Sequence, residues 1–260
     1  MRIKFLHPVL ICITLVLLGS CSNTKHLPAN EVLYTGAKLT VEGPKLRHKQ
    51  KKELKSNLSA LVRPKPNSKI LGFRFKLWLW NLAGNPKKKN SPAAWIKRQG
   101  EAPVLLSSVN LTRNQQVLQN TLENSGYFRA EVTGDTIVKN KHAHAEYKAT
   151  TGIQYTINQT TFPADSSEIS KAIALTKARS LLKPKAPFDL EIVKAERARI
   201  DGRLKQRGYY FFDQNYLLFD IDSTIGDNKV NMFLKTSIKK NYATRHFCHF
   251  FIHEAFLFNQ

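Results

Sequence analysis

Hydrophobic residues recur along the chain with two spacings, and each spacing predicts one kind of element. Alternation of apolar and polar residues over 37–43 predicts a strand, whereas three- and four-residue spacing over 49–61 predicts a helix. Helical spacing returns over 111–125 and is followed by alternating runs over 127–138 and 142–152. The first half of the chain is therefore expected to fold as strand, helix, helix, strand, strand.

The second half of the chain repeats this order. Residues 153–162 alternate and predict a strand whose apolar side carries Ile153, Tyr155 and Ile157. Two helices should follow, the first opening at the capping-box pair Asp165 and Glu168 and the second capped by Asp189. Alternating runs over 217–221 and 230–234 complete the second copy.

The second helix of each copy ends in the same short motif. "LENSGYF" at 122–128 and "LKQRGYY" at 204–210 share Leu-x-x-x-Gly-Tyr-aromatic, and their glycines are 82 residues apart. A motif repeated with its surroundings indicates a duplicated structural unit. Gly126 and Gly208 should end the helices in the left-handed conformation. The aromatic residues after them are expected to be the first strand residues, packed against the helices: Tyr127, Phe128, Tyr209 and Tyr210.

Charge adds a feature that the periodicity does not show. The net charge is +22, and residues 44–100 hold sixteen Lys or Arg against the single acidic residue Glu53. Such a surface suits an anionic partner. Within this stretch, "GFRFKLWLWNL" in an extended conformation would place Phe73, Phe75, Leu77 and Leu79 on one side.

Two interpretations of this basic aromatic segment stay open. It is either an insertion that packs on the first copy or an interfacial segment on a membrane. In the second case Trp78 and Trp80 would lie at the depth of the lipid headgroups. The lysines that would then meet lipid phosphates are Lys87, Lys88 and Lys89.

The start of the chain has the three parts of a secretory signal. Arg2 and Lys4 precede an apolar run to Leu18, and small residues precede Cys21. "LGSC" resembles a bacterial lipobox, in which cleavage follows the serine and the cysteine is acylated. The alternative is a buried cysteine after an uncleaved anchor helix. Export argues against nucleic acid as the anionic partner and favours lipid phosphates.

The ordered series of these features resembles a known family. A β-α-α-β-β unit whose helix ends in Gly-Tyr-[Phe/Tyr] resembles the POTRA domains of BamA/TamA-type outer-membrane assembly proteins. The lipobox, "PNSKILGFRFKLWLWN", "GEAPVLL", "ENSGYFRAEV" and "ERARIDGRLKQRGYYFF" are together similar to the lipid-anchored TamA-like subunit of Bacteroidota, TamL. The resemblance covers residues 18 to about 240.

This resemblance implies an α+β fold of two tandem POTRA-like modules after a lipoprotein signal peptide. The expected parts are a signal peptide (1–20), a lipidated tether (21–35), module 1 (36–152, insertion about 63–108), module 2 (153–240) and an atypical tail (241–260). Family members continue into a transmembrane barrel that is not visible in this sequence. We therefore expect a truncated or frameshifted form.

The resemblance also implies a function without catalysis. The chain would be a periplasmic scaffold of outer-membrane protein assembly and translocation, on the outer membrane and facing the periplasm. Its partners would be outer-membrane lipid, outer-membrane protein clients and an inner-membrane-anchored TamB-like protein. Clients would add as strands to exposed sheet edges, for which the candidate residues are Leu39, Val41, Ile153, Tyr155 and Ile157. The alternative is an envelope lipoprotein that binds anionic lipid or lipopolysaccharide through the basic aromatic segment.

Residue patterns for catalysis or cofactor binding are weak. The sequence has no phosphate-binding glycine loop, serine-centred elbow or paired CxxC, so no catalytic residue and no cofactor is expected. His142 and His144 are interpreted as a solvated strand face. A zinc site is the alternative reading of a cluster in the tail, which departs from the pattern before it: His246, Cys248, His249, His253 and Glu254.

Overall fold

The computed structural model describes residues 23–24 and 26–237 of the 260-residue chain. The expected signal peptide, Cys21 and the histidine-rich tail lie outside these residues. The chain divides into two compact units, one built from residues up to 41, 47–118 and 132–149, and the other from 42–46, 119–131 and the residues from 150 on. None of the described helices is both long and apolar enough to cross a membrane.

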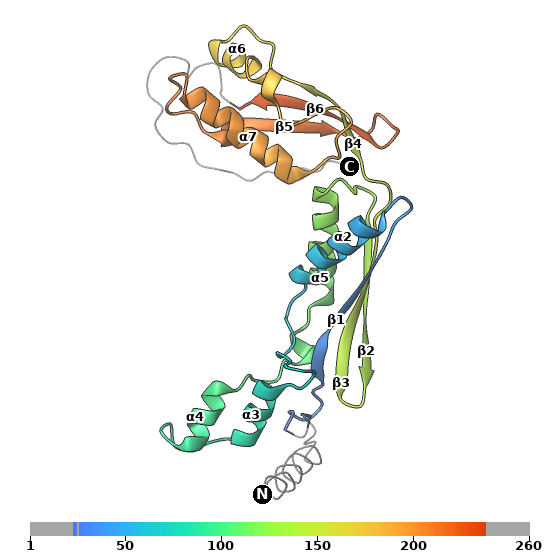
Figure 1. The fold of residues 1–260 in the computed structure, drawn as a ribbon, viewed down its shortest axis with the longest axis vertical. Helices are drawn as coiled ribbons and strands as arrows, with labels where there is room; N and C mark the ends of the chain where they lie inside the picture. Colours follow the sequence, from blue (N-terminus) through green and yellow to red (C-terminus); the bar gives the residue numbers. More distant parts are fainter. Residues whose placement is uncertain (1–22, 25, 238–260) are drawn as a thin grey trace, which may run out of the picture. The chain divides into compact units, whose positions relative to one another are not determined.

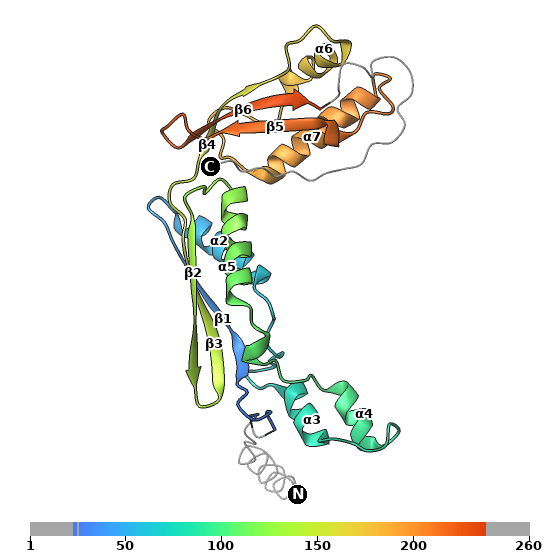
Figure 2. The same cartoon turned by 180° about the vertical axis from the view of Figure 1, so that it is seen from behind.

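The first unit contains a three-stranded sheet backed by two helices (Figures 1 and 2). Its elements in chain order are β1 (Leu33–Glu42), α2 (His48–Leu61), α5 (Leu111–Asn124), β2 (Glu131–Lys139) and β3 (His142–Thr150), of which the last part of α5 and single end residues of the strands group with the other unit. The strand order is β1-β3-β2. A two-residue turn joins β2 to β3, and Asn140 and Lys141 both have the positive φ angles of a type I′ hairpin turn. The predicted order of elements is confirmed.

Alternation along β3 places the core of the first unit on one face of the sheet. Ala143, Ala145, Tyr147 and Ala149 are buried, while the residues between them are partly or fully exposed. The three alanines on this face are small. Leu58 of α2 and Leu118 of α5 are fully buried from the helix side. Leu61 is exposed, so the apolar stripe of α2 is narrower than its leucine spacing predicts.

The second unit repeats this arrangement in a second sheet. Its elements are β4 (Thr156–Thr161), α6 (Glu168–Ala174), α7 (Leu190–Lys205), β5 (Leu217–Asp222) and β6 (Lys229–Thr236). The strand order is β4-β6-β5, with β4 parallel and β5 antiparallel to β6. Both copies thus place the last strand in the middle of the sheet. The α+β class and the two β-α-α-β-β copies expected of POTRA-like modules are confirmed.

The repeated glycine motif forms the same helix end in both copies. Tyr127 donates its backbone N–H to the carbonyl of Leu122 at 2.9 Å, and Tyr209 donates to Leu204 at 3.1 Å. This six-residue closure requires a left-handed residue just before the tyrosine. Gly126 and Gly208 provide it, with φ angles of 85° and 94°.

The aromatic residues after these glycines do not begin the strands, contrary to the prediction. In the first copy β2 starts at Glu131, and in the second a 3₁₀ turn (Gln214–Tyr216) precedes β5. Tyr127 is buried and Phe128 and Tyr209 are partly buried, as expected of core residues. Tyr210 is 74% exposed, so its assignment to the core was wrong. Phe212, two residues later, takes the buried position because the chain still turns after Gly208.

One of the two predicted helix caps is confirmed. The carboxylate of Asp189 accepts the Glu191 N–H at 2.8 Å and caps α7. Helix α6 instead begins after Ser167, whose hydroxyl accepts the Ser170 N–H. Asp165 lies two residues before this N-cap and accepts hydrogen bonds from the Ser167 N–H and the Ser170 hydroxyl. Hydrogen bonds from these two serines lower the pKa of the exposed Asp165 carboxyl to about 2.

Candidate functional site: sheet edges and a basic hairpin

The outer strands of the first sheet are β1 and β2, and an outer strand offers backbone groups to another chain. The start of β1 is already paired within the unit. Tyr34 donates to the Val104 carbonyl at 2.8 Å, and Leu106 donates to the Val32 carbonyl at 2.9 Å. The predicted edge residues Leu39 and Val41 lie further along β1 with buried side chains. Only the backbone near them is placed to pair with another chain.

Strand β2 is the longer open edge of this sheet, and it was missing from the predicted site. Within 26–237, no backbone hydrogen bond joins its nine residues to a segment outside the sheet. Ile137 and Val138 expose their side chains near the end of the strand. The strand order identifies β2 as an edge strand, because the last strand, β3, lies in the middle of the sheet and leaves β2 on the outside.

In the second sheet, the predicted edge at the start of β4 is not open. Ile157 donates to the Ala186 carbonyl at 2.8 Å and accepts from the Lys185 N–H at 2.7 Å. Phe188 donates to the Tyr155 carbonyl at 2.9 Å, and both predicted side chains are buried. Ile153 precedes the strand. The prediction that Ile153, Tyr155 and Ile157 form an exposed edge is therefore wrong, and β5 is the other outer strand of this sheet.

The basic aromatic segment is a helical hairpin, so its extended interpretation was wrong (Figures 1 and 2). Helix α3 (Phe75–Ala83) and helix α4 (Pro92–Gln99) pack side by side. The Ser91 hydroxyl caps α4 by accepting the Ala94 N–H at 3.2 Å, and Pro92 occupies the first turn. Short apolar runs do not distinguish a strand from a buried helix by spacing alone.

Lys97 holds the two helices together near the connecting loop. Its ammonium group donates to the Gly84 carbonyl at 2.6 Å and to Asn85 Oδ1 at 2.8 Å. The same group lies 4.4 Å from the centre of the Trp80 ring, which is a cation–π contact. Trp78 stacks on Phe75 with ring centres 5.8 Å apart. Both tryptophans are thus half-buried parts of the hairpin.

A polar clasp closes the base of the hairpin. The buried amide of Asn67 donates to the Ala102 carbonyl at 2.7 Å and accepts the Val104 N–H at 3.0 Å. Beside it, the Glu101 carboxylate accepts the Ser68 N–H and hydroxyl, and Lys76 lies 3.4 Å away. The hydrogen bonds from Ser68, aided by Lys76, lower the pKa of Glu101. Both ends of the insertion are therefore fixed to each other.

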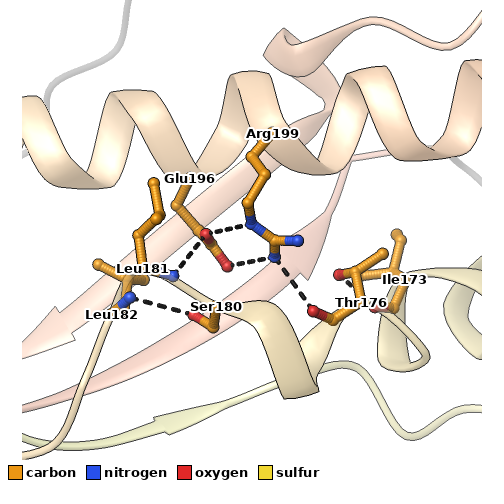
Figure 3. A network of polar contacts seen from close by, with 7 residues as sticks. All are labelled: Ile173, Thr176, Ser180, Leu181, Leu182, Glu196 and Arg199. Carbon is orange, nitrogen blue, oxygen red and sulfur yellow. Dashed lines mark hydrogen bonds and ion pairs between the residues drawn. The ribbon is translucent and has the colours of Figure 1, made fainter.

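The second unit contains a buried ion pair that sequence reasoning missed (Figure 3). The Glu196 carboxylate accepts two hydrogen bonds of 2.7 Å from the Arg199 guanidinium and one of 3.0 Å from the Leu181 N–H. Arg199 also donates to the Thr176 carbonyl at 3.2 Å. These contacts tie the segment between α6 and α7 to α7. The network links backbone groups rather than an open cavity, so we interpret it as structural.

The pKa of Glu196 results from opposed effects. Burial raises the pKa, but the Arg199 guanidinium, the Leu181 N–H and the Ser180 hydroxyl together outweigh burial and lower it. The two histidines of β3 make local contacts. The ring Nε2 of His144 lies 3.3 Å from the Glu146 carboxylate, and His142 Nδ1 lies 2.8 Å from the Asn140 carbonyl. The residues that the structure describes contain no group of three or more potential metal ligands.

Comparisons with known proteins give low-scoring structural matches. No protein-family model and no curated protein matches the chain. POTRA1-2 of the periplasmic domain of Omp85 from Anabaena matches with a TM-score of 0.36 and 10% identity, over 81% of this chain and 98% of that one. BamA POTRA3-5 from Haemophilus influenzae gives 0.31 and 14%, over 81% and 99%. CdiB from Escherichia coli gives 0.28 and 9%, over 83% and 29%. Scores this low transfer no activity, and the fold class rests on the chain's own topology.

Proposed function

We propose that this chain is a periplasmic scaffold of an outer-membrane protein assembly and translocation factor, held at the outer membrane by lipid on Cys21. The observation that carries the proposal is the open outer strand β2 in a unit of β-α-α-β-β order. The second copy of that order and its repeated Leu-Gly-Tyr helix end support the resemblance to the POTRA part of TamL. A tandem scaffold of this kind binds and positions chains and needs no catalytic group.

The proposed mechanism is strand addition to β2. An extended client strand would pair its backbone with the outer side of β2, and each net hydrogen bond would contribute about 0.5–1.5 kcal/mol. Backbone pairing is the same for every client sequence, which suits a scaffold for many outer-membrane proteins. The exposed Ile137 and Val138 would add apolar contacts. The stretch of β1 around Leu39 and Val41 is a shorter second edge for a client or for an inner-membrane-anchored TamB-like partner.

Proline substitution in β2 tests this mechanism. Successive strand residues direct their N–H groups to opposite edges, so Ile137→Pro and Val138→Pro remove one outward and one inward donor. The variant that loses the outward donor should keep its circular dichroism spectrum and lose capture of a peptide copied from a barrel strand. The variant that loses the inward donor should instead destabilise the sheet. Equal capture of the peptide by both variants, each folded, would rule out addition at β2.

A further inference from the structure

The free end of the α3–α4 hairpin combines exposed apolar and basic side chains. Leu82 lies in the last turn of α3 and Trp95 in the first turn of α4, and each is 59% exposed. The loop between the helices carries the exposed lysines Lys87, Lys88 and Lys89. We call these five residues the hairpin tip. Trp and Leu beside lysines are the side chains that proteins place at a membrane surface.

The charge around the tip has one sign. Residues 69–100 contain eight Lys or Arg and no Asp or Glu. The loop is also held in place, because Ser91 donates to the Lys88 carbonyl at 2.9 Å and Lys97 donates to the Gly84 carbonyl. The tip is therefore a preformed cationic surface that also carries two exposed apolar side chains. Its chemistry complements a layer of anionic lipid headgroups.

The start of the described chain lies against the same hairpin. The Asn81 side chain, next to Leu82, donates to the Asn23 carbonyl at 3.4 Å, and Thr24 is buried. Cys21 precedes Asn23 by two residues in the sequence. A lipid on Cys21 would thus enter the membrane close to the hairpin tip. This step rests on the anchor named in the proposed function, whereas the charge and exposure of the tip do not.

We propose that the hairpin tip docks on an anionic phospholipid surface beside the lipid anchor. Trp95 and Leu82 enter the headgroup region, and Lys87, Lys88 and Lys89 contact lipid phosphates. Trp78 and Trp80, the tryptophans first expected at this depth, are instead held within the hairpin by Phe75 and Lys97. Docking adds a second attachment to the single anchor and fixes which face of the first unit meets the membrane.

Tryptophan quenching tests the docking with the full chain. The chain is mixed with an excess of phosphatidylcholine vesicles, with or without phosphatidylglycerol, that contain acyl-brominated lipid. The difference between wild type and Trp95→Phe isolates the Trp95 signal. We expect Trp95 to be quenched in the anionic vesicles and released in 1 M salt, where the Debye length falls to about 3 Å.

Charge-matched variants decide whether the lysines act at the tip. Replacing Lys87, Lys88 and Lys89 by Gln should lower the docked-to-free ratio on the order of 100-fold. Replacing Lys49, Lys51 and Lys52 of α2 by Gln removes the same charge elsewhere and should leave the quenching of Trp95 nearly unchanged. All six lysines are exposed, so both variants should fold.

Four results would overturn the docking, and the first three come from the quenching measurements. They are an unquenched Trp95 at saturating anionic vesicles, equal quenching in neutral vesicles, and equal loss in both lysine variants. The fourth is shielding of Trp95 when a protein is added without any lipid, because it would show that the partner is a protein and not a lipid surface. Flotation of wild type against Cys21→Ser reports the anchor separately, and peptide capture by β2 reports the scaffold. Failure of the docking is thus distinguishable from failure of the proposed function.

Discussion

Removing the Glu196 carboxylate should destabilise the second unit strongly. Glu196 is completely buried, and Arg199 is only 17% exposed. Glu196→Ala would leave the guanidinium without its carboxylate and the Leu181 N–H without its acceptor. Breaking one side of a buried ion pair costs about 3–5 kcal/mol. Because Arg199 keeps some access to water and its bond to the Thr176 carbonyl, we expect a loss of about 3 kcal/mol in the free energy of unfolding.

The two units provide an internal control for this measurement. All three tryptophans lie in the first unit, whereas Glu196 lies in the second. In urea, the circular dichroism transition of the second unit should move to lower denaturant while the tryptophan fluorescence transition stays in place. Thermal unfolding should show a drop of more than about 10 °C for that unit, since 1 kcal/mol corresponds to roughly 4–8 °C in a domain of this size.

A double variant separates the ion pair from its backbone contact. Glu196→Leu combined with Arg199→Met removes both charges and leaves the Leu181 N–H as the main unsatisfied group, at a cost of about 1–3 kcal/mol. It should therefore be more stable than Glu196→Ala. The reasoning is refuted if Glu196→Ala costs under about 1 kcal/mol, or if the double variant is the less stable of the two.

Three further predictions follow from local geometry. Gly126→Ala should cost about 2 kcal/mol or more and Gly208→Ala about 1 kcal/mol in urea unfolding, because both have positive φ but only the Cβ at 126 would meet the Phe188 carbonyl, at 2.7 Å; equal costs would contradict this. Asn67→Ala should lower the free energy of unfolding measured by tryptophan fluorescence by about 1–3 kcal/mol, since two buried backbone groups lose their partners. An unchanged free energy would show that the clasp is dispensable. The lowered pKa of Glu196 means that its stabilisation is complete above pH 4.5 and is lost as pH falls through the folded-state value, so urea melts of wild type and Glu196→Gln should converge only below pH 4.5; a gap that closes at higher pH would contradict the lowered pKa.

Periodicity and helix ends could be predicted because they depend on local sequence. The alternation over β3 and the Leu-Gly-Tyr closures need only residues within one element. The covered edge of β4 could not be predicted in this way. Its cover consists of backbone hydrogen bonds from 185–188, which depend on where a loop lies and not on which side chains it carries.

The structural ion pair and the exposed tryptophan were missed for a similar reason. Glu196 and Arg199 have the spacing of an ordinary exposed pair on a helix, but in the fold Glu196 is fully buried and accepts the Leu181 N–H. The tryptophans Trp78 and Trp80 stood out by composition, but packing decides that Trp95 is the exposed one. Composition predicted a basic aromatic surface, but only the packing of the hairpin determines which of its side chains are exposed to solvent.

The pairing of 185–188 with the start of β4 also limits how the second sheet can add strands from other copies of this chain. A sheet with two unpaired edge strands can add a strand from another chain on each side. Every addition leaves a new unpaired edge strand, so such growth does not stop by itself. Here one edge is occupied along part of its length by the protein's own loop. In the second sheet, a copy that joins through β5 would therefore meet a partly covered edge on the far side, at the start of β4.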